Sequence, residues 1–128
     1  MENQIVIIDD EIILRTLIKE WLNENGFKNI ITYESPVNAL KEIEEGKIQP
    51  ALIITDYEMP DMKGSEFVDK IKFLYPKIPA VIVTGNTEAK AELSGKYKVL
   101  LKARLDFLQT LTQYVKDTLT KGVGHDTV

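Results

Sequence analysis

Short apolar runs recur five times along the chain. They are IVII at 5–8, NIITY at 29–33, ALIIT at 51–55, AVIVT at 80–84 and KVLL at 98–101. The first and third runs are apolar without alternation, which is typical of strands buried on both faces of a parallel sheet. The sequence therefore predicts five strands in this order.

Between these runs, apolar residues recur at intervals of three and four, as on one face of an amphipathic helix. Helices are predicted over residues 11–25, 35–45, 65–75 and 88–93, with a last helix from about 105 to 119. The first helix is expected to face inward with Ile13, Leu14, Leu17, Ile18, Trp21 and Leu22, and the last with Leu105, Leu108, Leu111, Val115 and Leu119. Ser35 followed by Pro36 predicts a helix start, and Gly26 and Gly46 predict helix ends.

The alternation of strands and helices predicts right-handed crossovers that build one parallel sheet with helices on both faces. At 128 residues the chain has the length of a single domain. We therefore expect an α/β fold with a doubly wound five-stranded parallel sheet over residues 1–120. The last residues, KGVGHDTV at 121–128, are expected to be a flexible tail or the start of a linker.

Composition and charge narrow the classes of function. Lys and Arg number 16 against 20 Asp and Glu, and the net charge of −4 provides no basic field for a nucleic-acid backbone, so direct nucleic-acid binding is not expected. The absence of cysteine excludes disulfides, thiolate zinc sites and cysteine nucleophiles, and suits a reducing compartment. No apolar stretch approaches the roughly 20 residues that span a bilayer. We expect a cytoplasmic protein without membrane contact.

Polar residues stand where four of the predicted strands end. The first strand is followed by Asp9 and Asp10, the third by Asp56 and the fifth by Lys102, while the fourth ends in Thr84. In parallel α/β sheets ligands bind outside the carboxyl ends of the strands. These five side chains are therefore expected to surround one crevice.

Three carboxylates in one crevice repel each other unless some are protonated or a cation lies among them. A hard divalent ion with oxygen ligands, Mg²⁺ or the similar Mn²⁺, satisfies this arrangement best. Together with such a cation, Lys102 and Thr84 suit a phosphoryl group carried on one carboxylate. Asp56 is the expected acceptor, because aspartate is a known covalent phosphoryl acceptor and its neighbours provide ligands on both sides.

Each of these features also has a purely structural interpretation. Asp9 and Asp10 precede a helix and are suited to capping it. The acidic residues that begin at Asp56 in ITDYEMPDMKG would by themselves indicate a solvated turn. Alone, Thr84 is a strand-end residue and Lys102 a surface lysine. Their joint occurrence at the ends of four strands favours a site.

Four segments together resemble the response-regulator receiver domain of two-component signalling. They are IVIIDDE, LIITDYEMPDMKG, VIVTG and VLLKA. The resemblance covers Gln4 to about Leu119. It implies a flavodoxin-like sheet with the strand order 2-1-3-4-5.

The same resemblance implies a role for each acidic residue. Asp10 and Asp56 would bind the metal directly, Asp9 would act through water, and the backbone carbonyl of Glu58 would complete the protein ligands. Asp56 would be phosphorylated by a histidine kinase or a phosphotransfer protein. Gly64 would help to shape the following loop.

The remaining roles concern the phosphoryl group after transfer. Thr84 and Lys102 would contact its oxygens. Glu58 and Asn86, two residues after the acceptor and two after the threonine, are candidates for setting the lifetime of the phosphorylated state. Receiver domains signal through protein contacts, so the partner would be an output protein or a missing C-terminal effector domain.

The sequence departs from the receiver pattern in three places. Ala103 follows Lys102 where proline is usual, so a trans peptide is predicted there. Val99 occupies the position of the usual switch aromatic, and Tyr97, two residues earlier, shares its face. The segment 84–102 is short for the family, which predicts a fourth helix that is short or disordered.

Three functions follow from these observations. The first is a phosphorylation-controlled switch, which accepts a phosphoryl group without being an enzyme in the usual sense. The second is a receiver-like binding module that acts without phosphorylation, suggested by Ala103, Val99 and the shortened fourth-helix region. The third is a phosphatase of the haloacid dehalogenase type, whose nucleophile motif needs a second aspartate where this chain has Glu58.

Overall fold

Strands and helices alternate strictly along the chain. The computed structural model describes residues 4–126, with side chains through residue 120. The elements are β1 (Ile5–Ile8), α1 (Ile12–Glu24), β2 (Ile30–Tyr33), α2 (Pro36–Glu44), β3 (Leu52–Asp56), α3 (Gly64–Leu74), β4 (Ala80–Thr84), α4 (Thr87–Leu93), β5 (Lys98–Leu101) and α5 (Phe107–Asp126).

The five strands form one parallel sheet in the order β2-β1-β3-β4-β5, as predicted. β1 lies between β2 and β3, so that Ile7 is paired with Thr32 on one side and Ile54 on the other. Because all strands run in the same direction, their carboxyl ends share one edge of the sheet. That edge carries Asp56 and Thr84, the last residues of β3 and β4.

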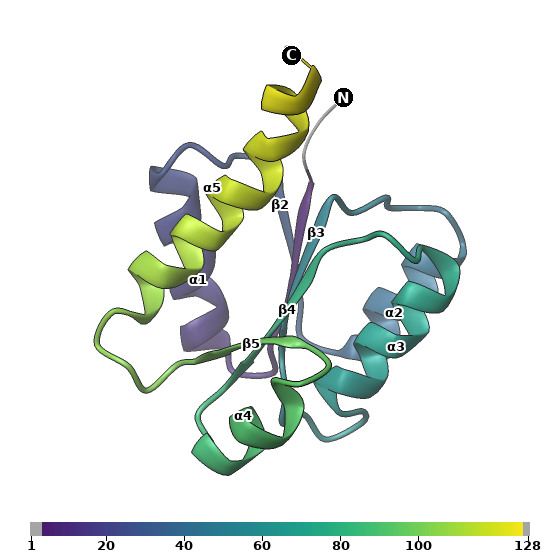
Figure 1. Ribbon diagram of the computed structural model, residues 1–128. Helices are drawn as coiled ribbons and strands as arrows, with labels where there is room; N and C mark the ends of the chain where they lie inside the picture. Colours follow the sequence, from purple (N-terminus) through teal and green to yellow (C-terminus); the bar gives the residue numbers. More distant parts are fainter. Residues whose placement is uncertain (1–3, 127–128) are drawn as a thin grey trace.

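Helices cover both faces of the sheet (Figure 1). On one face α1 and α5 pack over a cluster that includes Ile7, Ile54 and Val83. On the other face α2 and α3 pack over Val6 and Ile53. Successive strand residues point to opposite faces, so both sides of each central strand contribute to the core and its apolar pattern is continuous.

The inward face of α1 is narrower than predicted. Ile18 and Leu22 are buried and Leu14 is partly buried, whereas Ile13 and Leu17 are 81% and 44% exposed. Residues spaced by four stay in line along a helix, while each single residue turns by about 100°. The line through Leu14, Ile18 and Leu22 meets the sheet, and it leaves Ile13 and Leu17 on the solvent side.

The start of the last helix also differs from the prediction. Leu105 is fully exposed and lies before α5, which begins at Phe107. A turn in which the Phe107 amide donates to the Arg104 carbonyl (3.1 Å) precedes the helix and directs Leu105 outward. Up to residue 120, the buried apolar residues of α5 are Phe107, Leu111, Val115 and Leu119. On its side toward α1, Thr112 accepts a hydrogen bond from Trp21 Nε1 (2.7 Å).

The helical backbone of α5 continues to Asp126, into the segment 121–128 that the sequence predicted as a tail. The last two residues of that segment lie outside the described part of the chain. A role as a linker stays a prediction. Within residues 4–126, no helix has both the length and the apolar character that a bilayer span requires.

The predicted ends of α1 and α2 are confirmed. Ser35 Oγ accepts a hydrogen bond from the Val37 amide (3.1 Å), and Pro36 is the first residue of α2. Gly26 and Gly46 follow α1 and α2 with φ angles of 99° and 74°. These are backbone conformations that glycine adopts without a steric penalty.

The fourth helix is short, as predicted, and it is ordered. Asn86 caps it, with Oδ1 accepting from the amides of Glu88 (2.8 Å) and Ala89 (3.0 Å). None of the residues of α4 is fully buried, and Leu93 packs against the cluster of Val68, Ile82 and Val99. α4, which lies next to β5 (Figure 1), is therefore held mainly by its Asn86 cap and by the packing of Leu93.

Candidate functional site

Three carboxylates meet at the carboxyl edge of the sheet. Asp9 and Asp10 follow β1, and Asp56 ends the neighbouring strand β3. One oxygen of each lies within 4.8 Å of the others. Asp9 and Asp56 are 2% and 4% exposed, whereas Asp10 is exposed. The cluster is thus buried on the protein side and open to solvent at Asp10.

One oxygen of the Asp56 carboxylate accepts two hydrogen bonds. Lys102 Nζ and the Tyr57 amide both donate to its Oδ1, each at 3.0 Å. Both hydrogen bonds from described residues thus go to Oδ1. Lys102 is mostly buried and lies also 3.7 Å from Glu11 Oε1. Among the described hydrogen bonds, none goes to Asp56 Oδ2.

Burial and mutual repulsion make the ionised forms of these carboxylates costly. Burial, and then the charge of Asp9, raise the pKa of Asp56 to about 6, although the hydrogen bond and charge of Lys102 oppose the shift. Burial also raises the pKa of Asp9, partly offset by the hydrogen bond from the Glu11 amide. Burial by itself would lower the pKa of Lys102, but its hydrogen bond to Asp56 and the surrounding carboxylates raise it overall. A bound cation would therefore stabilise the ionised carboxylates of this site.

The donor set fits a hard divalent cation. Carboxylate oxygens with open positions for water are the ligands that Mg²⁺ and Mn²⁺ accept. The three carboxylates of Asp9, Asp10 and Asp56 supply these oxygens, and the exposed Asp10 leaves room for water. The part assigned to the Glu58 carbonyl stays a prediction.

Gly64 lies very close to the backbone at the end of β3. A Cβ at this position would lie 2.3 Å from the backbone oxygen of Asp56. The Gly64 amide donates to the Tyr57 carbonyl (2.9 Å), which closes the loop between β3 and α3. Only glycine permits this approach, and this explains the loop-shaping role expected from the sequence.

Thr84 is fully buried at the end of β4, beside β3. Its hydroxyl donates to Glu58 Oε1 (3.2 Å) and accepts from the Asn86 amide (3.1 Å). The two residues that the sequence singled out as lifetime candidates thus both contact Thr84. That both residues would contact the same hydroxyl was not predicted. The contact of Glu58 depends on its side-chain rotamer, which no sequence pattern encodes.

The peptide between Lys102 and Ala103 is trans, as predicted, and no cis peptide occurs between residues 4 and 126. The Lys102 amide donates to the Thr84 carbonyl (2.9 Å), which fixes the end of β5 against β4. From this position the Lys102 side chain reaches Asp56. The alanine therefore leaves the lysine in contact with the expected acceptor.

The position of the usual switch aromatic is a buried valine. Val99 is 5% exposed and packs with Val68 and Ile82. Tyr97 lies against the same cluster, as strand alternation predicted, but its hydroxyl donates to Asp69 Oδ1 of α3 (2.8 Å). Tyr97 is therefore tied to α3 at the start of β5.

Two contacts of Asp9 were not predicted from the sequence. Its Oδ1 accepts from the Glu11 amide (2.8 Å), and its backbone carbonyl accepts from Arg15 Nη1 (2.6 Å). Both donors come from the start of α1, which thereby fixes the end of β1. The sequence signal that could have predicted the second contact was the position of Arg15 near the start of α1, close to Asp9 and Asp10.

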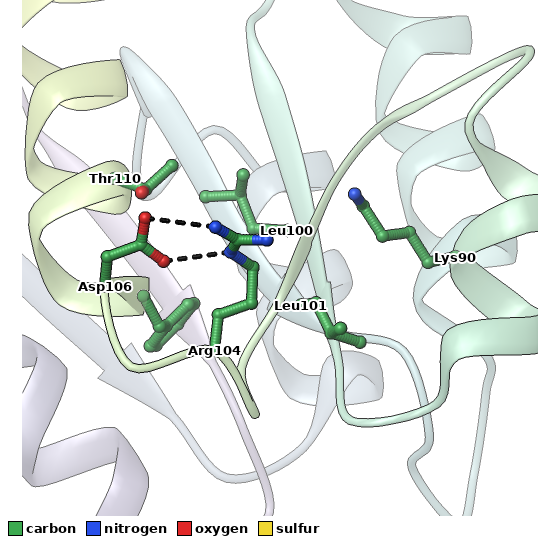
Figure 2. Close-up of a pocket in the computed structure, with 7 residues that line it drawn as sticks. Lys90, Leu100, Leu101, Arg104, Asp106 and Thr110 are labelled. Atoms are coloured by element: carbon green, nitrogen blue, oxygen red, sulfur yellow. Dashed lines mark hydrogen bonds and ion pairs between the residues drawn. The ribbon is translucent and has the colours of Figure 1, made fainter.

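A separate hollow lies between α4 and α5 (Figure 2), and none of the residues that line it belongs to the cluster of Asp9, Asp10 and Asp56. Its lining residues are Lys90, Leu100, Leu101, Arg104, Asp106, Phe107 and Thr110. Within it, Arg104 forms a forked pair with Asp106, with nitrogen to oxygen distances of 2.9 and 3.3 Å. Both partners are solvent-exposed, so the pair contributes little stability.

A family model described as response regulator receiver domain matches residues 5–103. The chain belongs to this family. Receiver domains are the signalling modules of two-component systems, and the strand order and the acidic cluster at the sheet edge agree with that assignment.

Curated relatives include proteins with different outputs. Protein-glutamate methylesterase/protein-glutamine glutaminase 3 of Burkholderia thailandensis is 28% identical over 125 residues, which are 92% of this chain and 34% of the relative. Chemotaxis protein CheY1 of Helicobacter pylori is 26% identical over 83 residues, which are 63% of this chain and 66% of the relative. The chain spans about a third of the length of the methylesterase relatives.

Solved structures match over nearly the whole chain. The response regulator TrrA of Thermotoga maritima, in complex with Mg²⁺ and BeF, has a TM-score of 0.78 at 28% identity and covers 92% of this chain and 99% of its own. Chemotaxis protein CheY4 of Vibrio cholerae has a TM-score of 0.76 at 26% identity, with the same coverage.

Proposed function

We propose that this receiver domain is a phosphorylation-controlled switch of a two-component or phosphorelay system in the cytoplasm. A histidine kinase or phosphotransfer protein donates a phosphoryl group to Asp56. The altered surface then binds an output protein or acts on a C-terminal effector domain. The observation that carries the proposal is the setting of Asp56, a buried carboxylate with two carboxylate neighbours and Lys102 Nζ at 3.0 Å.

The transfer uses the ionised carboxylate of Asp56 as the nucleophile. With a pKa of about 6, most molecules carry it ionised at neutral pH. Oδ2 attacks the phosphorus while the bond from phosphorus to the donor's imidazole nitrogen breaks, and that nitrogen keeps the bonding pair. With acetyl phosphate the phosphorus–oxygen bond breaks and acetate leaves. In both cases the product is an acyl phosphate on Asp56.

Four groups are assigned to the cation. Asp10 and Asp56 would hold Mg²⁺ or Mn²⁺ directly, Asp9 through water and Glu58 through its backbone carbonyl. A bound cation supplies positive charge that offsets the phosphoryl oxygens. Support comes from the clustering of the three carboxylates and from the related TrrA, whose structure contains Mg²⁺ and BeF.

Lys102 and Thr84 are assigned to the phosphoryl oxygens. Lys102 already donates to the acceptor carboxylate, so its ammonium is positioned to follow the charge onto the phosphoryl group. Thr84 comes directly after Val83, the residue paired with Asp56 in the sheet. Glu58 and Asn86 contact the Thr84 hydroxyl, which supports their assignment as residues that tune the phosphoryl lifetime.

Intact-protein mass spectrometry tests the proposal. The chain is incubated with Mg²⁺ and acetyl phosphate, with and without a chelator, beside the Asp56→Asn variant. A phosphate-sized mass gain that requires Mg²⁺ and is confined to the wild-type protein is expected. Equal labelling of both proteins would overturn the assignment of Asp56. Turnover of general phosphomonoesters is not expected and would instead favour a phosphatase.

A binding module that acts without phosphorylation is the second candidate. It is favoured by the buried Val99 and by the hydrogen bond that ties Tyr97 to Asp69, because neither side chain is free to act as the usual aromatic switch. Under this candidate, Asp56→Asn leaves partner binding and cellular output unchanged. A loss of output in that variant would exclude it.

A further inference from the structure

The Thr84 hydroxyl has one proton, and it donates that proton in a hydrogen bond to Glu58. Thr84 Oγ1 donates to Glu58 Oε1 at 3.2 Å, while its lone pair accepts from the Asn86 amide at 3.1 Å. A hydroxyl has a single O–H donor. If a phosphoryl group forms at Asp56, its oxygens and the Glu58 carboxylate therefore compete for the same proton.

We propose that the Glu58 side chain is a latch that holds Thr84 in the unphosphorylated arrangement. The proposal rests on the phosphorylation of Asp56 put forward above. Thr84 reaches the phosphoryl group only after it releases Glu58. The latch thus lowers the population of the activated state without contact between Glu58 and the phosphoryl group.

Charge acts in the same direction as the lost hydrogen bond. Glu58 stands two residues after the acceptor, and its exposed carboxylate is drawn toward the site by Thr84. A phosphoryl group on Asp56 places further negative charge beside it, and like charges at short range repel. Release of Glu58 toward solvent is then the favourable response.

The latch is connected to α4 through Asn86. The Asn86 amide donates to Thr84 Oγ1, and the Asn86 side chain caps α4 by accepting from the amides of Glu88 and Ala89. A rotation of the Thr84 hydroxyl toward Asp56 therefore disturbs the residue that begins α4. Because no residue of α4 is fully buried, little packing opposes its movement.

Two substitutions at Glu58 separate the hydrogen bond from the charge. Glu58→Ala removes both, whereas Glu58→Gln removes the charge and keeps a weaker acceptor. Asp61→Asn is the matched control, because Asp61 is an exposed acid of the same turn and none of the hydrogen bonds at the described site involves it. Glu58 is itself exposed, so all three variants are expected to fold.

The measurement is the apparent Kd for beryllium fluoride in the presence of Mg²⁺, followed by amide NMR shifts. We expect Glu58→Ala to bind about threefold to tenfold more tightly than the wild type, which is the range of one ordinary net hydrogen bond, because Glu58 is solvent-exposed. Glu58→Gln should lie between the two, and Asp61→Asn close to the wild type. The Asn86 amide should shift in Glu58→Ala even without the mimic.

A Thr84→Val background tests whether the effect passes through the hydroxyl. Without that hydroxyl, the difference between Glu58→Ala and Glu58→Gln should disappear. A difference that persists in this background would overturn the latch. So would a Glu58→Ala variant that binds the mimic no more tightly than Asp61→Asn while the wild type binds it normally. If neither the wild type nor any of the variants binds beryllium fluoride, the proposed function fails and the latch fails with it.

Discussion

Lys102 Nζ lies 3.0 Å from Asp56 Oδ1, although β4 separates β3, which ends in Asp56, from β5, which Lys102 follows. The side chain crosses the end of β4 beside Gly85, where a Cβ would lie 3.8 Å from Lys102 Cε. Only a long side chain spans this distance. Among the described residues, Lys102 is the one whose positive charge lowers the pKa of Asp56, and it reaches Asp56 from the far side of β4.

Replacing Lys102 by methionine should raise the pKa of Asp56 above its value of about 6. The hydrogen bond and the charge of Lys102 both lower that pKa, and burial and Asp9 raise it. The measurement is a pH titration of the aspartate carboxyl carbons by NMR. Lys98→Met, at the exposed start of the same strand, is the control. An unchanged Asp56 pKa in Lys102→Met would show that the ion pair is absent in solution.

Replacing Asp56 by asparagine should stabilise the protein in the absence of divalent cations. The folded state holds the Asp56 proton more tightly than the unfolded chain, with a pKa of about 6 against 3.8. Stability therefore falls as pH rises from about 4 to about 6, and the lower value persists above. Asparagine removes this penalty, which amounts to about 1–3 kcal/mol at neutral pH.

Chemical denaturation of Asp56→Asn and wild type at pH 4 and pH 7.5 measures this difference. The gain in free energy of unfolding should be present at pH 7.5 and shrink at pH 4. Asp61→Asn should change stability by less than about 0.5 kcal/mol at either pH, as is usual for an exposed site. A destabilised Asp56→Asn at pH 7.5 would contradict the pKa assignment.

Gly64→Ala should destabilise the protein by about 1–3 kcal/mol, the usual cost of overpacking a close contact. Its Cβ would lie 2.3 Å from the Asp56 backbone oxygen, so the loop must move. Gly95→Ala is the control, because a Cβ there meets nothing within 4 Å. Thermal or chemical denaturation gives the comparison. Equal stability of the two variants would contradict this prediction, because it would mean that the loop after β3 shifts to admit the Cβ without a cost in free energy.

Mg²⁺ binding should weaken as pH falls through about 6. The carboxylates must lose their protons to bind a cation, and the pKa of Asp56, raised to about 6 by burial, places its proton loss near that pH. Burial raises the pKa of Asp9 in the same direction. Asp10→Asn should weaken Mg²⁺ binding at pH 7.5 by at least about tenfold, since Asp10 is a proposed direct ligand and the substitution removes its charge. Calorimetric titration measures both effects, with Asp61→Asn as the control. Unaltered binding in Asp10→Asn would contradict the proposed ligand set.

Much of this site was predictable because a parallel sheet places all carboxyl ends at one edge. Asp9, Asp56, Thr84 and Lys102 stand at or directly after the ends of continuous apolar runs, and the strand order then brings them together. The positions depend on strand boundaries, which apolar patterning marks well. The backbone course, including the trans peptide before Ala103, was predictable for the same local reasons.

Details that depend on side-chain direction were not predictable. Leu105 fits the helical spacing of α5 but is exposed, because the turn that includes Arg104 delays the helix until Phe107. Ile13 fits the apolar spacing of α1, yet the sheet contacts only the line through Ile18. The bond from Thr84 to Glu58 depends on two rotamers.

Borohydride reduction tests directly whether Asp56 carries the phosphoryl group. The direct measurement is to treat the Mg²⁺- and acetyl phosphate-incubated protein with borohydride, which reduces an acyl phosphate to an alcohol, and to locate the change by tandem mass spectrometry. We predict reduction of residue 56 to homoserine, and no such product without Mg²⁺. A modified residue elsewhere, or an unmodified Asp56 under conditions in which Mg²⁺ binds, would contradict the account.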